Sequence, residues 1–597
     1  MALQEPSDSS RRPLPALREL GVLSLVLAAF AGLAVGARIG LPFVGDDYVF
    51  MDKTRAATFA ELWSPTKSID FGWYRPWARE VHFWVLQRAL DLNPTAYRLV
   101  NVGLWIGSLL VFWAVLRKLA SPRVAAIAAL GVAPLALWGT PLLWISGSQD
   151  LWMLAFVLLS LLLFLQHQAI LAAVVFIFAL LSKETAGVLP ALLCAYLMIG
   201  ERRTLWQAIR RTWLFWTLLL SWALLHPTLR TRLLGGLASS TELQQRPSWH
   251  IVLLKSVAAC LNLDRVPHPQ EVDASDVCRV LASAILLAAA VMLFARRTHT
   301  GLSSPDARPI TTIAVAWTVI GWCPSFLPSI GWHAYYGCLG ALGAWFWAAI
   351  WLQARPAVAA ALIGVLAILR GAQANTVSSD WGDEAYIQTA GSTLEAIRLE
   401  MVRQHPTLPP HSRVYFANIP YHIGLIAGES PALRVWYADG TLQAGYYSYY
   451  APRTADAPPG PDYFLRFDPA VGMVEVKAGA EDVEAAVAAN PLWEEDHDGL
   501  ADLFVFKDDL PRAAVEYEKL AHLDHRPDAA LRSAACLYLL GDSAKAEALV
   551  RGARPRFRGT DLEIQLLLSR IQEHTAERLK EGRSGVGRSS GAEGVRK

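Results

Sequence analysis

Eleven apolar segments follow one another through the first 371 residues, and this pattern restricts the chain to a membrane-spanning helical fold. They lie at about 20–40, 98–116, 124–141, 150–165, 169–182, 186–200, 212–226, 277–295, 309–323, 335–353 and 356–371. A helix needs about 20 apolar residues to cross a bilayer, and most of these segments approach that length. Charged residues make up only 18% of the 597 residues, against roughly 25% in soluble domains. The sequence therefore predicts a polytopic α-helical membrane protein with about eleven spans.

Basic residues in the short loops predict the orientation of these spans. Lys and Arg collect in segment 1–19 and again near 117–123, 202–211, 296–308 and 355, whereas the alternate short loops hold almost none. Cytoplasmic loops are the ones that carry an excess of Lys and Arg. The N-terminus is therefore predicted to be cytoplasmic, and an odd number of spans places the region after residue 371 outside. The net charge of +2 gives no support for nucleic-acid binding.

The chain divides by composition into a membrane part and a soluble part. Residues 20–371 form the predicted transmembrane domain, with long outer loops at 41–97 and 227–276. In the first loop, residues 77–90 read as a helix lying in the interface plane, with Trp77, Val81, Trp84 and Val85 on its apolar face and Arg79, Glu80 and Arg88 elsewhere. The second loop shows no clear periodicity.

The region after residue 371 is predicted to be extracytoplasmic. Residues 372–507 read as an α/β domain, with a helix over 383–405 and short strands in "SRVYFANIP", "ALRVWYAD", "PDYFLRFD", "MVEVKAG" and "DLFVFKDD". Residues 508–578 read as paired helices that resemble tetratricopeptide units, with Gly541 five residues before Ala546. Residues 579–597 are predicted to be disordered.

Two adjacent acids, Asp46 and Asp47, come within a few residues of the end of the first apolar segment. Ionisable groups close to lipid are costly and tend to mark functional sites. Further polar residues recur at the predicted outer ends of other spans: Arg75, Gln149, Asp150, Lys183, Glu184, His333, Tyr335 and Tyr336. A protein that only spans the membrane does not need such an accumulation on one face.

An acid pair opposite cations suits glycosyl transfer from a lipid-linked phosphate sugar. The leaving phosphate is already anionic, so it needs cations rather than a general acid, and Lys183, Arg75 and His333 can supply them. The acceptor hydroxyl needs a base as it attacks the anomeric carbon, and one carboxylate can serve. A single base predicts direct displacement with inversion. The second acid can orient the first, bind a sugar hydroxyl or raise the pKa of its neighbour.

Each of these residues also has a purely structural interpretation. Lys183 and Glu184 suit a simple ion pair in a tight turn. Arg75, before Pro76, can anchor the loop, and Asp150 can be the N-cap of the span that it begins. His333 can be an interface residue, and Tyr335 and Tyr336 can belong to an aromatic belt.

Several motifs in a fixed order resemble one family. The sequence resembles the GT-C glycosyltransferases, in the branch of protein O-mannosyltransferases and transmembrane tetratricopeptide mannosyltransferases. The resemblance covers about residues 20–350 and depends on "GDDYVF", "YRP", "NPTAYRLVNVGLW", "WISGSQDLWMLAF", "FALLSKETAGVLP" and "FLPSIGWHAYY". It implies that Asp46 or Asp47 carries the catalytic base and that Lys183 lies near the donor phosphate. Two departures concern the donor sugar and the acceptor: His333 with Tyr335 and Tyr336 where relatives often have an Arg-Tyr pair, and Gln149 where a basic residue is often found.

The predicted function is therefore transfer of mannose or another hexose from a polyprenyl-phosphate donor to a protein, glycan or lipid acceptor, at the outer side of a bacterial-type inner membrane. Gln149, Asp150, Glu184, Tyr335 and Tyr336 are the predicted substrate-binding residues. No cofactor is firmly predicted, although an acid pair can bind a divalent cation. The alternatives are a transporter or flippase of lipid-linked sugars, which predicts charges buried at mid-span, and a membrane-anchored interaction protein that binds a partner through its helical repeats.

Overall fold

We describe the protein from a computed structural model. The structure describes residues 14–64, 73–226, 249–264, 274–297, 307–326, 333–374, 384–417, 419, 430–446, 453–454, 456–468, 472–475, 497, 501, 504–505, 509–522 and 527–553. The chain forms two compact units, Met1–Thr393 and Leu394–Lys597, and each is described by itself. The predicted disordered tail 579–597 and the predicted repeat residues 554–578 lie outside the described residues.

The first unit consists of helices. Its longer helices are α1 (Leu14–Val35), α2 (Asp46–Arg55), α3 (His82–Leu90), α4 (Pro94–Leu119), α5 (Pro122–Val132), α6 (Gly139–Leu143), α7 (Ser148–Leu165), α8 (Ala169–Leu180), α9 (Leu189–Ile199), α10 (Leu205–Arg211), α11 (Trp213–Leu225), α14 (Trp249–Ala259), α15 (Ala274–Arg297), α16 (Ala307–Trp322), α17 (Cys338–Leu352) and α18 (Pro356–Gln373). Short turns of tighter or wider helix connect them: η1 (Gly36–Arg38), η2 (Glu61–Trp63), η3 (Trp77–Val81), η4 (Ala136–Trp138), η5 (Ile145–Gly147), η6 (Glu184–Val188), η7 (Cys323–Phe326) and η8 (Ala334–Gly337).

Seven helices in the described residues are long and apolar enough to cross a membrane: Leu17–Arg38, Pro94–Leu119, Ile145–Leu165, Ala274–Arg296, Arg308–Phe326, Ala334–Leu352 and Pro356–Gln373. If α5 and the helix Ala136–Leu143, which form a bent pair, are counted as one span, the number of candidate spans in the described residues rises to eight. The three other predicted spans coincide with the shorter apolar helices Ala169–Leu180, Glu184–Ile199 and Trp213–Leu225. The polytopic helical class is confirmed, whereas the count of eleven spans and the orientation stay predictions. The second predicted outer loop, 227–276, contains the helix α14.

The bend after α5 shows how a broken helix is accommodated among apolar neighbours. Pro134 follows α5 and cannot continue a helix, and the two halves meet at 63°. Buried backbone groups released by such a break need new partners. Asn262 donates to the Pro134 carbonyl at 2.8 Å and accepts from the Ala136 N–H at 2.7 Å, while Arg370 donates to the Leu135 carbonyl at 2.9 Å.

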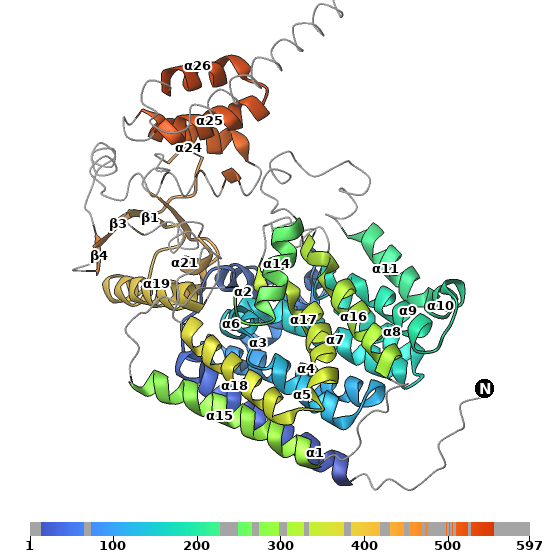
Figure 1. The fold of residues 1–597 in the computed structure, drawn as a ribbon. Helices are drawn as coiled ribbons and strands as arrows, with labels where there is room; N and C mark the ends of the chain where they lie inside the picture. Colours follow the sequence, from blue (N-terminus) through green and yellow to red (C-terminus); the bar gives the residue numbers. More distant parts are fainter. Residues whose placement is uncertain are drawn as a thin grey trace, which may run out of the picture. The chain divides into compact units, whose positions relative to one another are not determined.

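Packing among the long helices places several distant segments together. Helices α15 and α18 pack on each other, and α1 packs along α15 (Figure 1). Helix α4 packs against both α5 and α7, and α7 against α8. Their contact surfaces are closely packed, since a Cβ on Gly131 would come within 2.1 Å of the Trp345 ring. These packed helices fix the loops that carry the polar motifs.

Helix α19 (Glu384–Gln404) begins in the first unit and ends in the second. It lies within the helix predicted over 383–405. The predicted boundary after residue 371 is close to the division between the units and stays a prediction.

The second unit contains a four-stranded sheet of order β2-β1-β3-β4: β1 (Arg413–Ala417), β2 (Gln443–Tyr446), β3 (Asp462–Asp468) and β4 (Gly472–Glu475). Strand β1 pairs parallel with β2 and β3, and β4 pairs antiparallel with β3. Three of the predicted strands are confirmed. The strand predicted in "ALRVWYAD" is wrong, because Pro431 begins a helix there, α21 (Pro431–Trp436), as proline favours the first helical position. Phe504 and Val505 of "DLFVFKDD" are helical as well.

Three further helices of the second unit pack in sequence: α24 (Leu510–Ala521), α25 (Pro527–Leu539) and α26 (Ser543–Ala553). Gly541 joins the last two with a φ of +85°, a left-handed conformation that favours glycine after a helix. Small residues at the contacts, among them Ala513, Ala534 and Ala546, are fully buried and let the helices approach closely. Paired helices are thus present from residue 510, and their assignment to tetratricopeptide repeats stays a prediction.

Candidate active site

The two adjacent acids lie in the first turn of α2. Gly45 precedes them with a φ of +55°, a backbone conformation that glycine adopts without strain. The chain therefore turns sharply into the helix at Asp46. Negative charge in a first turn is favoured by the unpaired N–H groups of a helix N-terminus.

Asp47 is fully buried, and both of its carboxylate oxygens are bound. Its Oδ1 accepts hydrogen bonds from the Ser146 N–H at 2.8 Å and from the Ser146 hydroxyl at 2.6 Å. Its Oδ2 accepts from the Val44 N–H at 3.1 Å. Burial raises the pKa of Asp47 to about 6, although these hydrogen bonds and the charge of Arg98 act in the opposite direction. Asp47 therefore holds the segment at Val44 against the segment that precedes α7.

Asp46 differs from its neighbour because it is only half-buried. Its negative charge acts on the Arg79 guanidinium and on the Tyr386 phenol, so it lies near both groups. The sequence left open which acid is the base. The two acids differ in the structure: Asp47 is buried and hydrogen-bonded, whereas Asp46 is more exposed.

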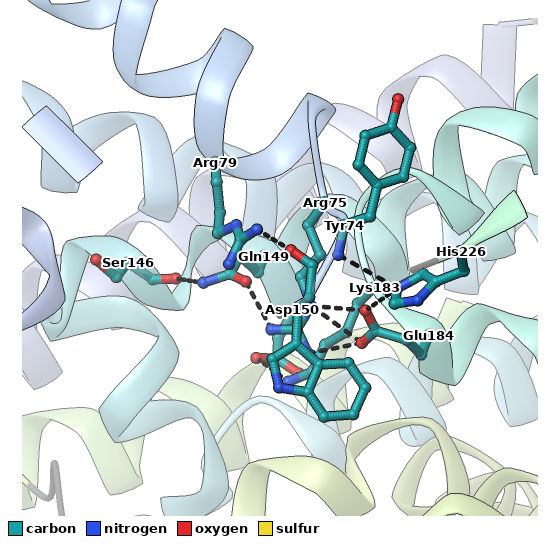
Figure 2. Close-up of polar contacts among 10 residues, drawn as sticks. Tyr74, Arg75, Arg79, Ser146, Gln149, Asp150, Lys183, Glu184 and His226 are labelled. Carbon is teal, nitrogen blue, oxygen red and sulfur yellow. Dashed lines mark hydrogen bonds and ion pairs between the residues drawn. The ribbon is translucent and has the colours of Figure 1, made fainter. Parts of the chain in front are cut away.

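Arg75 is at the centre of a chain of polar contacts (Figure 2). Its Nε and Nη2 donate to the Glu184 carboxylate at 3.0 and 2.6 Å, and its Nη1 donates to the Gln149 side-chain oxygen at 2.7 Å. Gln149 in turn donates to the Ser146 carbonyl at 2.9 Å. Since Ser146 also binds Asp47, the chain of contacts connects Asp47 to Arg75.

The same chain continues from Glu184 to His226, a residue that the sequence analysis did not single out. His226 is fully buried, and its Nε2 lies 3.4 Å from Glu184 Oε1 and 3.2 Å from the Tyr74 N–H. It directly follows the last residue of α11. The other polar groups of the cluster also lie beside helix ends. That position at the end of an apolar segment was the only available signal.

Lys183 pairs with Asp150 and lies over two aromatic rings. Its ammonium donates to Asp150 Oδ1 and Oδ2 at 2.6 and 2.7 Å, and both residues are 5% exposed. The same nitrogen lies 5.2 and 4.6 Å from the ring centres of Tyr335 and Tyr336. The His333 ring stacks on Tyr335 with 5.4 Å between centres. The aromatic residues are thus arranged around a buried cation.

Two structural interpretations of these residues are wrong. Lys183 and Glu184 do not pair with each other: Lys183 binds Asp150 and Glu184 binds Arg75, because adjacent residues of the extended backbone at Lys183 point in different directions. Asp150 is not an N-cap, since α7 is preceded by Gly147 and Asp150 lies in its first turn. Residues adjacent in the sequence therefore join two different ion pairs of one cluster.

The segment 77–90 folds differently from the predicted interface helix. Its first turn, η3, is a π-helical turn that buries Arg79 and Glu80, which the sequence analysis placed away from the buried face. Arg79 donates to the Trp73 carbonyl and lies 3.4 Å from Glu80 Oε1, and Val85 is exposed. The wider π-turn changes which side chains point to the interior, so a 3.6-residue repeat identifies the wrong buried face for this segment. π-Turns are frequent at functional sites.

Two further buried polar residues hold the loops around the acid pair. Arg98 is completely buried near the start of α4 and donates to the carbonyls of Leu41, Pro42 and Leu143. Asn101, one turn later, donates to the carbonyls of Pro141 and Ile145 at 3.1 and 3.2 Å. Both belong to the motif "NPTAYRLVNVGLW", but the sequence does not reveal which backbone they bind.

The structure therefore gathers the predicted site residues into one polar cluster. Arg75, Gln149 and Glu184 form one part, and Asp150, Lys183, His333, Tyr335 and Tyr336 form the other. The charges of Arg75 and Glu184 act on Lys183, so the two parts adjoin. Asp47 connects to the first part through Ser146, and Asp46 lies on the side of Arg79.

Metal ligands are not assembled in the described part of the chain, where no group of three or more His, Cys, Asp and Glu side chains is placed to hold an ion.

Comparisons with known proteins give distant structural similarities. No protein-family model matches the chain, and no curated protein matches it significantly. The chain is similar to the crystal structure of ArnT from Cupriavidus metallidurans bound to undecaprenyl phosphate, with a TM-score of 0.37 and 14% identity over 72% of this chain and 86% of that one. It is also similar to an oligosaccharyltransferase from Archaeoglobus fulgidus tethered to an acceptor peptide, with a TM-score of 0.36 and 9% identity over 73% of this chain and 64% of that one. Both TM-scores lie below 0.5, so the function is inferred from the site and from the sequence.

Proposed function

We propose that this protein is a membrane glycosyltransferase that moves a hexose from a polyprenyl-phosphate donor to an acceptor hydroxyl, with Asp46 as general base. The observation that carries the proposal is the asymmetry of the acid pair. Asp47 is buried with both carboxylate oxygens bound, while Asp46 is half-buried and its charge acts on the Arg79 guanidinium. The donor class comes from the chemistry of that cluster, and mannose is the hexose that the sequence resemblance favours.

The proposed reaction is a direct displacement. The acceptor hydroxyl gives its proton to the Asp46 carboxylate while its oxygen bonds to the anomeric carbon. The bond between that carbon and the phosphate oxygen breaks on the opposite side, and polyprenyl phosphate leaves with the electron pair. The configuration at the anomeric carbon is therefore inverted. General base catalysis by a positioned side chain typically contributes about 10²–10⁴-fold.

Arg75 and Lys183 are the cations proposed to receive the leaving phosphate. A guanidinium has five N–H donors, and the hydrogen bonds of Arg75 to Glu184 and Gln149 use three of them. Preorganised cations in a site that excludes water stabilise developing negative charge strongly. The carboxylates of Asp150 and Glu184 keep these two side chains in place. We therefore propose that Asp150, Glu184 and Gln149 act by positioning the cations, instead of binding substrate directly as the sequence predicted.

His333, Tyr335 and Tyr336 form the aromatic side of the cluster, beside Lys183. We propose that this side contacts the donor. Aromatic faces pack well on the apolar face of a hexose ring, and both tyrosines carry a hydroxyl that can bind a polar group. The histidine ring can add a hydrogen bond to the phosphate.

The polar groups lie beside helix ends, as an enzyme with a site at the membrane surface requires. Asp150 is in the first turn of α7, Lys183 lies between α8 and η6, and His333 precedes η8. A transporter predicts a path of charges through the middle of the spans. None of these placements favours that alternative.

A transfer assay with two variants tests the proposal. Membranes with the wild-type protein are incubated with undecaprenyl-phosphate mannose labelled in the sugar, and label is followed into protein, glycan and lipid fractions. We expect transfer with inverted configuration, and a loss of about 100-fold or more in Asp46→Asn, because the amide cannot accept the proton. The matched control is Asp52→Asn in the same helix, whose carboxylate lies 3.9 Å from Arg55, and it should transfer normally. Normal transfer by Asp46→Asn overturns the base assignment, and no turnover of mannose, glucose or galactose carriers by the wild type overturns the donor class.

A further inference from the structure

A buried ion-pair triad holds the first residue of α19. Glu384 is 7% exposed, and its Oε1 accepts from Arg370 Nη2 at 3.1 Å while its Oε2 pairs with Arg38 Nη1. The two arginines also donate to backbone carbonyls, Arg38 to Ala374 at 3.3 Å and Arg370 to Leu135 at 2.9 Å. The triad thus joins the ends of three helical segments, η1, α18 and α19. A buried carboxylate with two cationic partners is strongly fixed, because removing one member leaves uncompensated charge.

Glu384 also lies directly against the backbone of α6. A Cβ built on Gly139 would come within 2.0 Å of Glu384 Oε1 and 2.7 Å of its carboxyl carbon. A side chain at position 139 would therefore occupy the place of the carboxylate. Helix α6 leads within a few residues to Ser146, which binds Asp47. The triad and the acid pair thus share one supporting segment.

The next turns of α19 pack on the loop that carries the acid pair. A Cβ on Gly391 would lie 3.2 Å from Val44 Cγ1 and 3.4 Å from Pro42 Cδ, so the helix backbone approaches this loop closely. Ile387 and Ala390 are fully buried on the same part of the helix. Glu384 and Gly391 are seven residues apart, a spacing that places both on one face of a helix.

Tyr386 lies between these two anchoring positions. It is half-buried, and its pKa is raised by burial and by the negative charge of Asp46. The phenol is therefore within electrostatic reach of the proposed base. No other role in the site uses α19, although its first ten residues belong to the same compact unit as the acid pair.

We propose that the ion-pair triad positions the first turns of α19 as the acceptor-side wall of the site, with Glu384 as the positioning residue and Tyr386 as the residue that contacts the acceptor hydroxyl. This inference rests on the proposed function. It assigns a part in the reaction to the helix after the last span, because α19 would close the side of Asp46 from which the acceptor enters.

Carboxyl footprinting tests the positioning without any substrate. The detergent-solubilised full chain is treated with a water-soluble carbodiimide and glycinamide, and labelling of Asp46 is measured by peptide mass spectrometry. Glu384→Gln removes the charge that holds both arginines, so α19 should separate from the loop and Asp46 should label at least about three-fold faster. Gly139→Ala is the second variant: it displaces the Glu384 carboxylate through steric overlap with the end of a flexible side chain, so the protein should still fold. The matched control is Glu395→Gln on α19, which removes a surface pair with Arg398 and should label as the wild type does.

A second measurement separates this inference from the proposed function. In the mannose transfer assay, both triad variants should lose transfer to the acceptor fraction several-fold, and Tyr386→Phe should do the same without a change in Asp46 labelling. Wild-type labelling of Asp46 in both Glu384→Gln and Gly139→Ala overturns the positioning role. If the wild type shows no transfer at all while Asp46 labels faster in the two triad variants, the proposed function is overturned. The positioning role of the triad is then still supported. Normal transfer by Tyr386→Phe overturns the acceptor contact alone.

Discussion

At the scale of single residues, Asp46 and Asp47 show that neighbours in a sequence can have different roles. Asp47 is structural, and Asp46 is the proposed general base. In an α-helix, residues i and i+1 point in directions about 100° apart, so a helix start between two packed surfaces can bury one and leave the other partly exposed. Asp47 faces Ser146 and is enclosed, whereas Asp46 faces the side of Arg79 and Tyr386. The motif "DD" alone contains no information on this division.

The buried acid gives a prediction about pH. The pKa of Asp47 is raised to about 6, so the folded protein binds this proton more tightly than the unfolded chain does. The contribution to stability is therefore fully present below about pH 4, near the ordinary pKa of an aspartate, and is lost as the pH rises through 6. We expect the apparent melting temperature of the wild type, relative to Asp47→Asn, to fall between pH 4 and 6.

Melting curves of the detergent-solubilised full chain at several pH values measure this difference. The Asp52→Asn variant in the same helix should follow the wild type at every pH. A constant difference between wild type and Asp47→Asn over this range would show that Asp47 does not titrate as described.

Residues missed at this scale were buried charges and amides within apolar helices. Arg98 and Asn101 bind loop carbonyls that lie about 40 to 60 positions away in the chain, and such partners follow from tertiary packing alone. An ionisable residue inside a predicted span is itself a signal of function or of structural pairing, and Arg98 provided that signal. His226 and Glu384 provided weaker signals, because each lies at the edge of an element.

At the scale of elements, hydrophobic periodicity predicted the helices well and their contacts poorly. Each of the eleven apolar segments coincides with a helix or a bent helix pair, because hydrocarbon-like surroundings leave the backbone few alternatives. The predicted site residues do come together. Their pairing was not predictable, since Lys183 and Glu184 adjoin in sequence and yet bind partners on different elements. The π-turn η3 also escaped prediction, because it departs from the 3.6-residue repeat.

The pair formed by Lys183 and Asp150 gives a prediction about how these elements are joined. Both groups are 5% exposed, so removing one partner leaves a buried charge without compensation, at a cost of about 3–5 kcal/mol. Lys183→Met and Asp150→Leu should each lower the apparent melting temperature by several degrees. The double variant should recover most of the loss, while transfer should remain impaired because the cation is gone.

A double-mutant cycle on the solubilised protein measures this coupling. The matched control is the exposed pair of Lys545 and Glu518, which joins α26 to α24 at 2.8 Å and should show a coupling below about 1 kcal/mol. Additive effects of Lys183→Met and Asp150→Leu would contradict a direct buried ion pair.

At the scale of the whole molecule, the first unit combines a large apolar helical assembly with one concentrated polar cluster. Six separated segments contribute to that cluster, from the loop that carries the acid pair to the residues just before α17. In our proposal, α19 adds a wall to the site. The ends of packed helices therefore hold the site rigid, as catalysis by preorganised charge requires. The cytoplasmic N-terminus and the inner-membrane location remain predictions from the loop charges.

The most direct test of the central claim is the position of the donor in a complex. An electron cryomicroscopy structure of the full chain is determined with a phosphonate analogue of undecaprenyl-phosphate mannose, which cannot release its sugar. We expect the anomeric carbon to lie about 4–6 Å from an Asp46 carboxylate oxygen, which leaves room for the acceptor oxygen between them, and the phosphonate to contact Arg75 or Lys183. An anomeric carbon more than about 10 Å from Asp46, with the phosphonate away from both cations, would contradict it.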